Sequence, residues 1–240
     1  MGKTLFVTGT GTDVGKTALS LAVLLWAKSR GLKAGYLKPI QCGTFDFGTP
    51  PNPIDDAAWV RHFAGEDTGT HVTYRLRMAA SPHLAAEREN RTIDSQHIVT
   101  EIELQKSLFD LLLVEGSGGA AVPINRQGLT LASLAAKLSI PTLIAAAPGL
   151  GTLHHTLTTM AFLKAAQVPI LGFVFSHRDL IVPETSADNR LTLESLSGIP
   201  CLGELHHCPE LAKDSKAFSS KAHTWITDLA RGLDKRWDTL

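Results

Sequence analysis

Cysteine is scarce in this chain, with three residues among 240, at positions 42, 201 and 208. The number is odd and the spacing irregular, so the sequence does not predict a disulfide framework. A chain of this length buries roughly 70 to 75% of its unfolded surface and needs neither disulfides nor a metal to hold a core. Scarce, unpaired cysteine is typical of a reducing compartment, and we expect a cytoplasmic location.

The chain also lacks net charge, because 23 lysines and arginines balance 23 aspartates and glutamates. Without a basic field, neither nucleic acid nor an anionic membrane is expected as a partner. The apolar run at 18–27 is ten residues long, whereas about 20 are needed to cross a bilayer. A hydrophobic content of 44% with 20 glycines and 12 prolines excludes disordered, collagen-like and coiled-coil classes. We expect one globular domain over residues 1–240.

Apolar runs that alternate with helical patterns make up most of the chain. Strands are predicted at Leu5–Thr8, Ala34–Lys38, Leu111–Val114, Thr142–Ala146, Ile170–Phe175 and Cys201–Gly203. Helices are predicted at 17–30, 94–108, 129–138, 152–166, 184–196 and 215–235, with a loop at 45–53. This alternation predicts an α/β fold, doubly wound, with a mostly parallel sheet and helices on both faces. Ligands of such sheets bind at the carboxyl ends of the strands, where the candidate residues follow.

The first predicted strand runs into a glycine-rich loop, which is followed directly by a helical pattern. The loop reads Gly9-Thr10-Gly11-Thr12-Asp13-Val14-Gly15-Lys16-Thr17. Glycines let backbone N–H groups surround phosphate oxygens, Lys16 neutralises phosphate charge, and the Thr17 hydroxyl reaches a metal ion. A glycine-rich turn with a surface lysine is the alternative. The strand, loop and helix context favours nucleotide binding.

Two further strand ends carry groups that suit phosphate chemistry. Lys38 ends the second strand and would stabilise developing charge, although a lone lysine there is also typical of a solvated surface. Cys42 is interpreted as a pocket-lining side chain, since no Cys–His pattern supports a nucleophile. Glu115 ends the third strand and is placed to hold Mg²⁺ beside Thr17, with a tight turn as the alternative.

For three other features, the sequence allows either a role in ligand binding or a purely structural role. Asp55 and Asp56 begin a helical stretch, where acids cap helices, yet a metal site needs a second carboxylate and either residue would supply it. Gly151 and Thr152 begin a helix whose N–H groups suit an anion, or are a plain helix start. The adjacent residues His206–Cys208 point in different directions and lack metal-site spacing, so no structural metal is expected.

Together these segments resemble one family, the ATP-dependent dethiobiotin synthetases of biotin synthesis. The resemblance rests on seven blocks in the family's order, which are VTGTGTDVGKT (7–17), GYLKPIQCG (35–43), DDAAW (55–59), ASPHLAAE (80–87), LLVEGSGG (112–119), LGTLHHT (150–156) and LGEL (202–205). They reach to about residue 205 and leave the C-terminal helical region without a signature.

The resemblance implies a homodimeric P-loop NTPase-like fold that converts 7,8-diaminopelargonate, CO₂ (or bicarbonate) and MgATP into dethiobiotin, ADP and phosphate. A substrate amine would form a carbamate, the carbamate would attack the γ-phosphate to give a carbamic–phosphoric anhydride, and the second amine would close the ureido ring. Electrostatic stabilisation of the transferring phosphoryl group is what such chemistry requires of the protein.

The resemblance also implies residue roles. The catalytic groups would be Lys16 and Lys38, and the Mg²⁺ ligands Thr17, Asp56 and Glu115. The nucleotide contacts would be Gly11, Thr12, Asp13, Val14, Gly15, Lys16, Thr17, Glu115, Gly116, Gly118 and Ser176. The substrate contacts would be Thr12, Lys38, Cys42, Ser117, Gly118 and Gly119, joined across the dimer interface by Gly151 and Thr152.

Two positions depart from the family pattern. Family members commonly carry serine or threonine where this chain has Cys42, so a hydroxyl contact becomes a weaker thiol contact. After the fifth strand the family has an Asn-x-Asp-like adenine reader, whereas Ser176 stands at the asparagine position here. A hydroxyl reads a base less selectively than an amide, so we expect other nucleoside triphosphates to be accepted beside ATP.

A P-loop partitioning or positioning ATPase, acting through protein partners, is the alternative function. Such proteins usually carry an extra lysine early in the phosphate loop, and residues 9–14 contain none. The shared fold alone would not separate the two functions, so the choice rests on the site residues.

Overall fold

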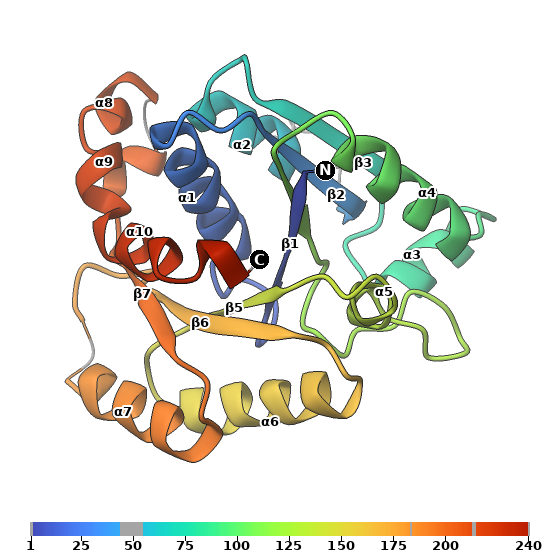
Figure 1. Ribbon diagram of the computed structural model, residues 1–240. Coiled ribbons are helices and arrows are strands. Elements are labelled where there is room, and N and C mark those ends of the chain that lie inside the picture. Colours follow the sequence, from blue (N-terminus) through green and yellow to red (C-terminus); the bar gives the residue numbers. More distant parts are fainter. Residues whose placement is uncertain (1, 44–54, 183, 213–214, 240) are drawn as a thin grey trace.

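The computed structural model describes residues 2–43, 55–182, 184–212 and 215–239 (Figure 1). The loop predicted at 45–53 lies outside the described residues. The strands are β1 (Lys3–Gly9), β2 (Ala34–Cys42), β3 (Gly69–Leu76), β4 (Leu111–Glu115), β5 (Thr142–Ala146), β6 (Ile170–Ser176) and β7 (Cys201–Leu205). The α-helices are α1 (Lys16–Ser29), α2 (Asp56–Ala64), α3 (Pro82–Arg88), α4 (Ser95–Lys106), α5 (Leu131–Lys137), α6 (Thr152–Ala165), α7 (Ser186–Ser197), α8 (Ser215–Ser219), α9 (Ala222–Trp225) and α10 (Thr227–Asp234).

The strands form a seven-stranded sheet in the order β3-β2-β4-β1-β5-β6-β7, and every neighbouring pair is parallel. β4 and β5 are buried along their whole length, as continuous apolar runs require when a sheet is covered on both faces. The doubly wound α/β fold predicted from the sequence is confirmed. All six predicted strands are present: β5 has the predicted bounds, and the other five are one to four residues longer than predicted.

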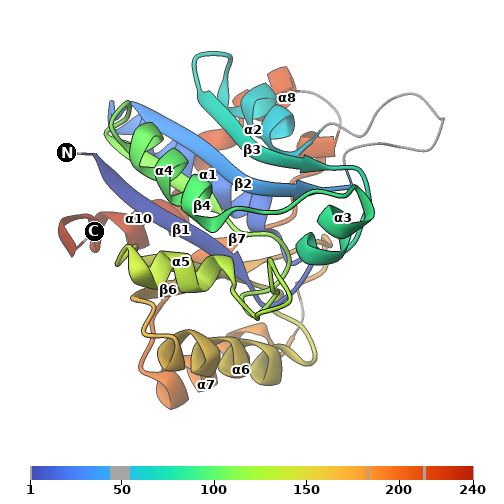
Figure 2. The same ribbon diagram turned by 90° about the vertical axis from the view of Figure 1, so that its right-hand side faces the viewer.

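Helices cover both faces of the sheet and form two separate apolar layers. One layer is built from α1, α2 and the C-terminal helices, with Trp26, Phe63 and Leu229 among its buried side chains. The other is built from α3 to α7, with Ile102 and Leu163 among its members. In Figure 2, α4 and α5 lie in front of the sheet and α1 lies behind it. The carboxyl ends of the strands remain open between the two layers.

Three elements differ from the sequence-based expectation, and one of them is α3, for which no helix was predicted. β3 was not predicted, and it forms an edge strand whose residues are mostly half-buried, so its sequence lacks a continuous apolar run. The single helix predicted at 215–235 is wrong, because the segment forms three short helices. Ser219 and Ser220 donate side-chain hydrogen bonds to backbone oxygens three to four residues earlier, which competes with helix continuation there.

The two ends of the chain meet at the amino edge of the sheet. Lys3 Nζ, in the first residue of β1, donates to the backbone oxygen of Trp237 at 2.6 Å. Trp26, near the end of α1, donates through Nε1 to Asp234 at 2.9 Å. The C-terminal segment is therefore attached both to the central strand and to the helix that follows the glycine-rich loop. Within the described ranges, no helix has the length and apolar character needed to cross a membrane.

Candidate active site

The glycine-rich loop lies between β1 and α1, where the backbone at Gly15 is left-handed with φ 88°. A Cβ at this position would lie 2.1 Å from Ser176 Oγ, so only glycine lets the loop pack against the end of β6. Lys16 Nζ donates to the backbone oxygen of Gly11 at 2.7 Å and thus folds back over the loop. Burial lowers the pKa of Lys16, and the opposing attraction of Glu115 does not cancel that effect. The loop has the form of a phosphate cradle.

Glu115, at the carboxyl end of β4, lies at the centre of the site and is fully buried. Its Oε1 accepts hydrogen bonds from Thr17 at 3.1 Å and from Lys38 at 2.7 Å. Its Oε2 accepts from Ser20 at 2.6 Å and from Tyr36 at 3.0 Å. Burial alone would raise the pKa of Glu115, but the Lys38 ammonium and these hydrogen bonds hold it below its ordinary value. The carboxylate is ionised at neutral pH.

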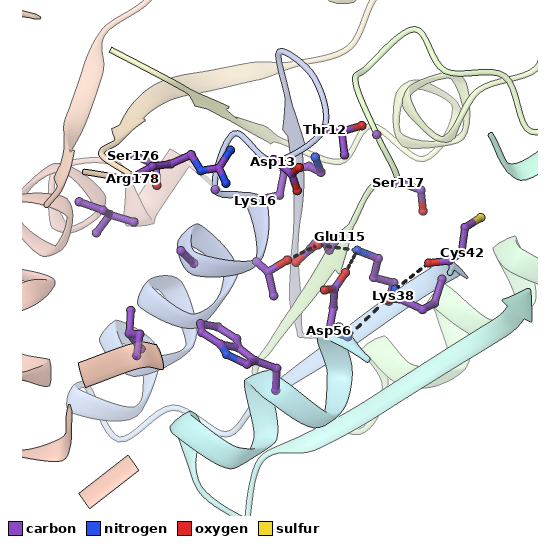
Figure 3. Close-up of a pocket in the computed structure, with 18 of the residues that line it drawn as sticks. Thr12, Asp13, Lys16, Lys38, Cys42, Asp56, Glu115, Ser117, Ser176 and Arg178 are labelled. Atoms are coloured by element: carbon purple, nitrogen blue, oxygen red, sulfur yellow. Dashed lines mark hydrogen bonds and ion pairs between the residues drawn. The ribbon is translucent and has the colours of Figure 1, made fainter. Parts of the chain in front are cut away.

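Lys38, on β2, is held between two carboxylates. It forms ion pairs with Asp56, at the start of α2, and with Glu115. Its side chain is 6% exposed, and burial by itself would lower its pKa. The charges of Glu115 and Asp56 outweigh burial and raise the pKa of Lys38 above its usual range. A solvated surface lysine is therefore excluded, and the structure places a buried cation between β2, β4 and α2 (Figure 3).

The two aspartates that begin the α2 segment have different environments. Asp55 is the N-cap of α2, since its Oδ1 accepts from the backbone N–H of Ala58 at 2.8 Å, and it also pairs with Arg75. Asp56 faces Lys38 and lines the cavity. Asp55 has the structural role, and Asp56 has the position of a site residue.

A cavity of about 1020 Å³ extends along the carboxyl ends of the strands and contains most of the predicted site residues. Those lining it are Thr12, Asp13, Gly15, Lys16, Thr17, Lys38, Cys42, Asp56, Glu115, Ser117, Gly118 and Ser176. Figure 3 shows Lys38, Asp56 and Glu115 pointing toward one another, with Cys42 and Ser117 on one side and Ser176 and Arg178 on the other. The site therefore has two wings that meet at a charged centre.

The wing beside Cys42 is lined by small and aliphatic groups from Ile40 and from the segment 79–82. Burial raises the pKa of the Cys42 thiol to about 11, so this side chain is a neutral thiol at physiological pH. Ser117 donates to the backbone oxygen of Ile40, which fixes the loop after β4 against β2. This wing suits an uncharged, flexible chain better than an anion.

The wing beside Ser176 is aromatic. His177 follows Ser176 and is buried, and its Nε2 lies 2.7 Å from Glu204 Oε2. Its ring stacks on that of His206, with centroids 4.9 Å apart and planes at 27°. The backbone oxygen of His206 accepts from Trp225 Nε1 at 2.8 Å. The buried His177 supports His206 from behind, and His206 and Trp225 line the cavity with flat π surfaces, which suits stacking with a planar ligand.

Six predicted residues do not line the cavity. Gly11, Val14, Gly116 and Gly119 belong to the loops that form its rim, and Gly119 lies against Gly11, where a Cβ would be 3.5 Å from the Gly11 Cα. Gly151 and Thr152 begin α6 outside the cavity of this chain. Thr152 is buried, and its hydroxyl pairs with Thr156 at 3.2 Å.

Oxygen groups converge on the charged centre from three elements. The Thr17 hydroxyl and the carboxylates of Asp56 and Glu115 are hard oxygen donors, and Mg²⁺ is usually held by one or two carboxylates together with phosphates and waters. This donor chemistry fits Mg²⁺. Throughout the part of the chain that the structure describes, no group of three or more His, Cys, Asp and Glu side chains is arranged to hold a metal ion by itself.

Sequence reasoning missed several residues of this region. Ser20 and Tyr36 contact Glu115, and His177 and His206 form the aromatic wing. Spacing carried a signal for the first pair. Ser20 is one helical turn after Thr17, and Tyr36 is two residues before Lys38 and so on the same face of its strand. No spacing rule connects His177 with His206, which come from neighbouring strand ends.

Comparison with known proteins identifies relatives along nearly the whole chain. The AAA domain family matches residues 3–215. The ATP-dependent dethiobiotin synthetase BioD of a Geobacillus strain is 34% identical over 232 residues, covering 94% of this chain and 93% of the relative. The protein of the same name from Halalkalibacterium halodurans is 31% identical over 238 residues, covering 98% and 94% of the two chains.

Solved structures with the same fold include two cell division proteins. The cell division ATPase MinD of Pyrococcus furiosus has a TM-score of 0.56 at 19% identity, with 98% of this chain and 99% of that chain covered. The septum site-determining protein MinD of Pyrococcus horikoshii, complexed with Mg-ADP, has a TM-score of 0.58 at 14% identity, with coverages of 98% and 97%. At these identities the likeness concerns the fold alone.

Proposed function

Because the chain belongs to the ATP-dependent dethiobiotin synthetase family, we propose that it joins 7,8-diaminopelargonate and CO₂ at the expense of MgATP, giving dethiobiotin, ADP and phosphate. The family relationship makes it an ATP-dependent ligase that forms C–N bonds.

The observation that carries the proposal is the buried cation at the meeting point of the two wings. Lys38 lies between Glu115 and Asp56, while Lys16 folds over the phosphate cradle nearby. Two cations beside a phosphate loop suit the transfer of a phosphoryl group, whose charge must be stabilised as it moves. The flat aromatic wing suits a nucleotide base, and the aliphatic wing suits the carbon chain of a diamine.

The reaction divides into three steps with balanced atoms. One amine of the diamine attacks CO₂ and loses a proton, which gives a carbamate. A carbamate oxygen attacks the γ-phosphorus of ATP, the bond to the bridging oxygen breaks, and ADP leaves. The second amine then attacks the carbonyl carbon of the resulting anhydride and loses a proton, and phosphate leaves as the ring closes. Each step creates or moves negative charge at the point where two wings of the cavity meet.

The residues have distinct tasks in these steps. Lys16 neutralises the phosphates and the carbamate, and Lys38 stabilises the phosphoryl group in transfer. Thr17, Asp56 and Glu115 would hold Mg²⁺, which supplies charge neutralisation to the phosphates. The loop residues 11–17 bind phosphate through backbone N–H groups, with Glu115 and Gly118 at the opposite wall and Gly116 between them in the rim. Thr12, Cys42 and the segment 117–119 contact the diamine.

Gly151 and Thr152 act in the second subunit of a homodimer. They lie outside the cavity of their own chain, and the preceding residue Leu150 is fully exposed. Leu180 and Ile181, in the loop before α7, are exposed as well. Large apolar side chains on loops beside neighbouring helices suit burial against a second copy of this chain. The N–H groups at the start of α6 would then reach the substrate carboxylate of the partner's site.

Base selectivity is broad in this proposal. Ser176 offers a single hydroxyl, and the flat surface beside it is the ring of His206, which stacks on the buried His177. Stacking accepts every base, because every base has a π face. ATP is therefore one of several nucleoside triphosphates that the enzyme uses.

The whole chain acts as one domain in the cytoplasm. Its C-terminal helices pack on α1 through Leu229 and Leu233, which supports a single unit over residues 1–240. Cys42, Cys201 and Cys208 carry free thiols, as suits a reducing compartment.

Phosphate release tests the proposal directly. MgATP is incubated with the protein alone, with bicarbonate, with 7,8-diaminopelargonate, and with both, and phosphate and dethiobiotin are measured. Release is expected with both substrates present, in equal amounts with dethiobiotin. Phosphate release that ignores the diamine would contradict the synthetase function.

The variant Lys38→Ala tests whether Lys38 acts in phosphoryl transfer. In Lys38→Ala, kcat is expected to fall at least ~100-fold while ATP affinity changes little, because the ammonium acts in the transition state. Equal losses in kcat and in ATP affinity would instead give Lys38 a role in ground-state binding.

A further inference from the structure

The four hydrogen bonds to Glu115 are divided between its two oxygens in a regular way. Oε1 takes one donor from α1, Thr17, and one from β2, Lys38. Oε2 likewise takes one donor from each element, Ser20 and Tyr36. Each oxygen of the carboxylate thus accepts one hydrogen bond from α1 and one from β2. These four donors fix the orientation of the carboxylate plane relative to the two elements.

The two oxygens differ in what lies beyond their donors. Thr17 and Lys38 line the cavity. Ser20 and Tyr36 do not belong to the cavity lining and are 0% and 1% exposed. Oε1 therefore accepts hydrogen bonds from residues that line the cavity, while Oε2 accepts them from residues in the protein interior.

This division has a consequence once Lys38 engages a ligand. In the structure Lys38 binds both Asp56 and Glu115, and its proposed partner during turnover is the phosphoryl group in transfer. As its ammonium turns to that group, Oε1 loses its closest donor. The last torsion of a glutamate is broad, so a carboxylate held only at Oε1 would be free to rotate.

We propose that Ser20 and Tyr36 are positioning residues, which hold Oε2 of Glu115 so that Oε1 keeps its direction toward the metal–nucleotide complex. The proposal rests on the proposed function in one respect, namely that Glu115 is a ligand of Mg²⁺. Neither hydroxyl touches substrate. Outer partners of metal ligands act in this way, and their loss typically costs 10- to 100-fold in metal affinity.

The test uses Tyr36→Phe, Ser20→Ala and the double variant in the full-length protein. ADP affinity is measured by calorimetry without metal and at increasing Mg²⁺ concentration. The metal-free dissociation constant is expected to stay within about twofold of wild type. The Mg²⁺ concentration that gives half of the metal-dependent effect is expected to rise roughly tenfold in each single variant and more in the double variant.

The chain supplies matched controls for both substitutions. Tyr74→Phe removes the hydroxyl of the other tyrosine, which lies on the edge strand β3. That hydroxyl accepts a hydrogen bond from the backbone N–H of Asp94, the N-cap of α4. Ser29→Ala removes a hydroxyl at the opposite end of α1, where it donates to the backbone oxygen of Trp26. Both controls are expected to show the wild-type dependence on Mg²⁺.

The possible results distinguish the positioning role of Ser20 and Tyr36 from the metal role of Glu115. Wild-type Mg²⁺ dependence in Tyr36→Phe and Ser20→Ala would overturn the positioning role, even if thermal unfolding shows that both are less stable. An ADP affinity that ignores Mg²⁺ already in the wild-type protein would overturn the metal role of Glu115, and the positioning role with it. If the double variant does not fold, the single variants decide.

Discussion

The ion pair between Lys38 and Glu115 is expected to stabilise the folded protein, and this expectation can be tested without measuring catalysis. Replacing Lys38 by methionine keeps the apolar stem and removes the ammonium. Removing one partner of a buried ion pair typically costs about 3 to 5 kcal/mol, because the other charge is left buried. Glu115 would keep its bonds from Thr17, Ser20 and Tyr36, which places the expected loss in the free energy of unfolding near the lower end, about 3 kcal/mol.

The assay is urea denaturation at pH 7, together with thermal unfolding. For a chain of this size, about 3 kcal/mol corresponds to a decrease in Tm of roughly 6 to 12 °C. The exposed pair of Lys28 and Asp67, 52% and 72% exposed, is the matched control. Lys28→Met is expected to cost less than about 1 kcal/mol.

A double-mutant cycle isolates the pair itself. Lys38→Met leaves the buried Glu115 carboxylate without its cation, and Glu115→Gln leaves Lys38 with Asp56 as its remaining partner, whereas the double variant removes both charges of the buried pair. The double variant is expected to be about 2 kcal/mol more stable than the sum of the single effects implies. Effects that add within ~0.5 kcal/mol would refute the reasoning, because the two charges would then not depend on each other.

The choice of pH follows from the directions of the two pKa shifts. The pKa of Glu115 is lowered in the folded protein, so its contribution is present above its unfolded pKa of about 4.3 and is lost as pH falls through the folded value. The pKa of Lys38 is raised, so its contribution is present below its unfolded pKa of about 10.4 and is lost as pH rises through the folded value. Both contributions are complete at pH 7.

Three further predictions concern the two wings and the exposed loop. Cys42, with its pKa of about 11, is expected to react with iodoacetamide at pH 8 on the order of 100-fold more slowly than a free thiol; equal rates by mass spectrometry would contradict the buried, neutral thiol. CTP, GTP and ITP are expected to support dethiobiotin formation with kcat/KM within about a hundredfold of ATP, and values below one hundredth of ATP's, a gap of ~2.7 kcal/mol, would show that Ser176 and the histidine stack do discriminate between bases. Leu150→Asp is expected to give a monomer in sedimentation analysis and to raise the KM for the diamine at least ~10-fold, while the affinity for ATP is unchanged. A variant that remains a dimer and has the wild-type KM would show that Gly151 and Thr152 do not bind the substrate.

The sequence predicts the interior of the fold better than its margins. β4 and β5 were predictable because both are buried on two faces and their residues are uniformly apolar. β3 was missed, because an edge strand has a neighbour on one side only and alternates residues such as Thr73 and Arg75 with its apolar positions, so it has no continuous apolar run. The C-terminal helices were predicted as one, since apolar spacing continues across the turn at Ser220 and Lys221 that separates α8 from α9.

The candidate site divides in the same way. The phosphate loop, Lys38 and Glu115 were predictable, because their residue types follow strand ends directly. The donors behind Glu115 and the stack of His177 on His206 were not, since they arise from side chains of different elements that meet only in the folded chain. Asp55 and Asp56 are adjacent in sequence, and only the start of α2 determines which one turns toward Lys38.

The contact between Lys3 and Trp237 has a practical consequence for engineering. Both ends of the chain lie at the amino edge of the sheet, whereas the cavity lies at the carboxyl edge. A purification tag or a fused protein at either end would therefore project away from the substrates. Because the ends are neighbours, a short linker could join them, and the chain could be reopened at an exposed turn such as Ser107 and Leu108. The order in which the elements are synthesised could thus be permuted while the cavity is kept intact.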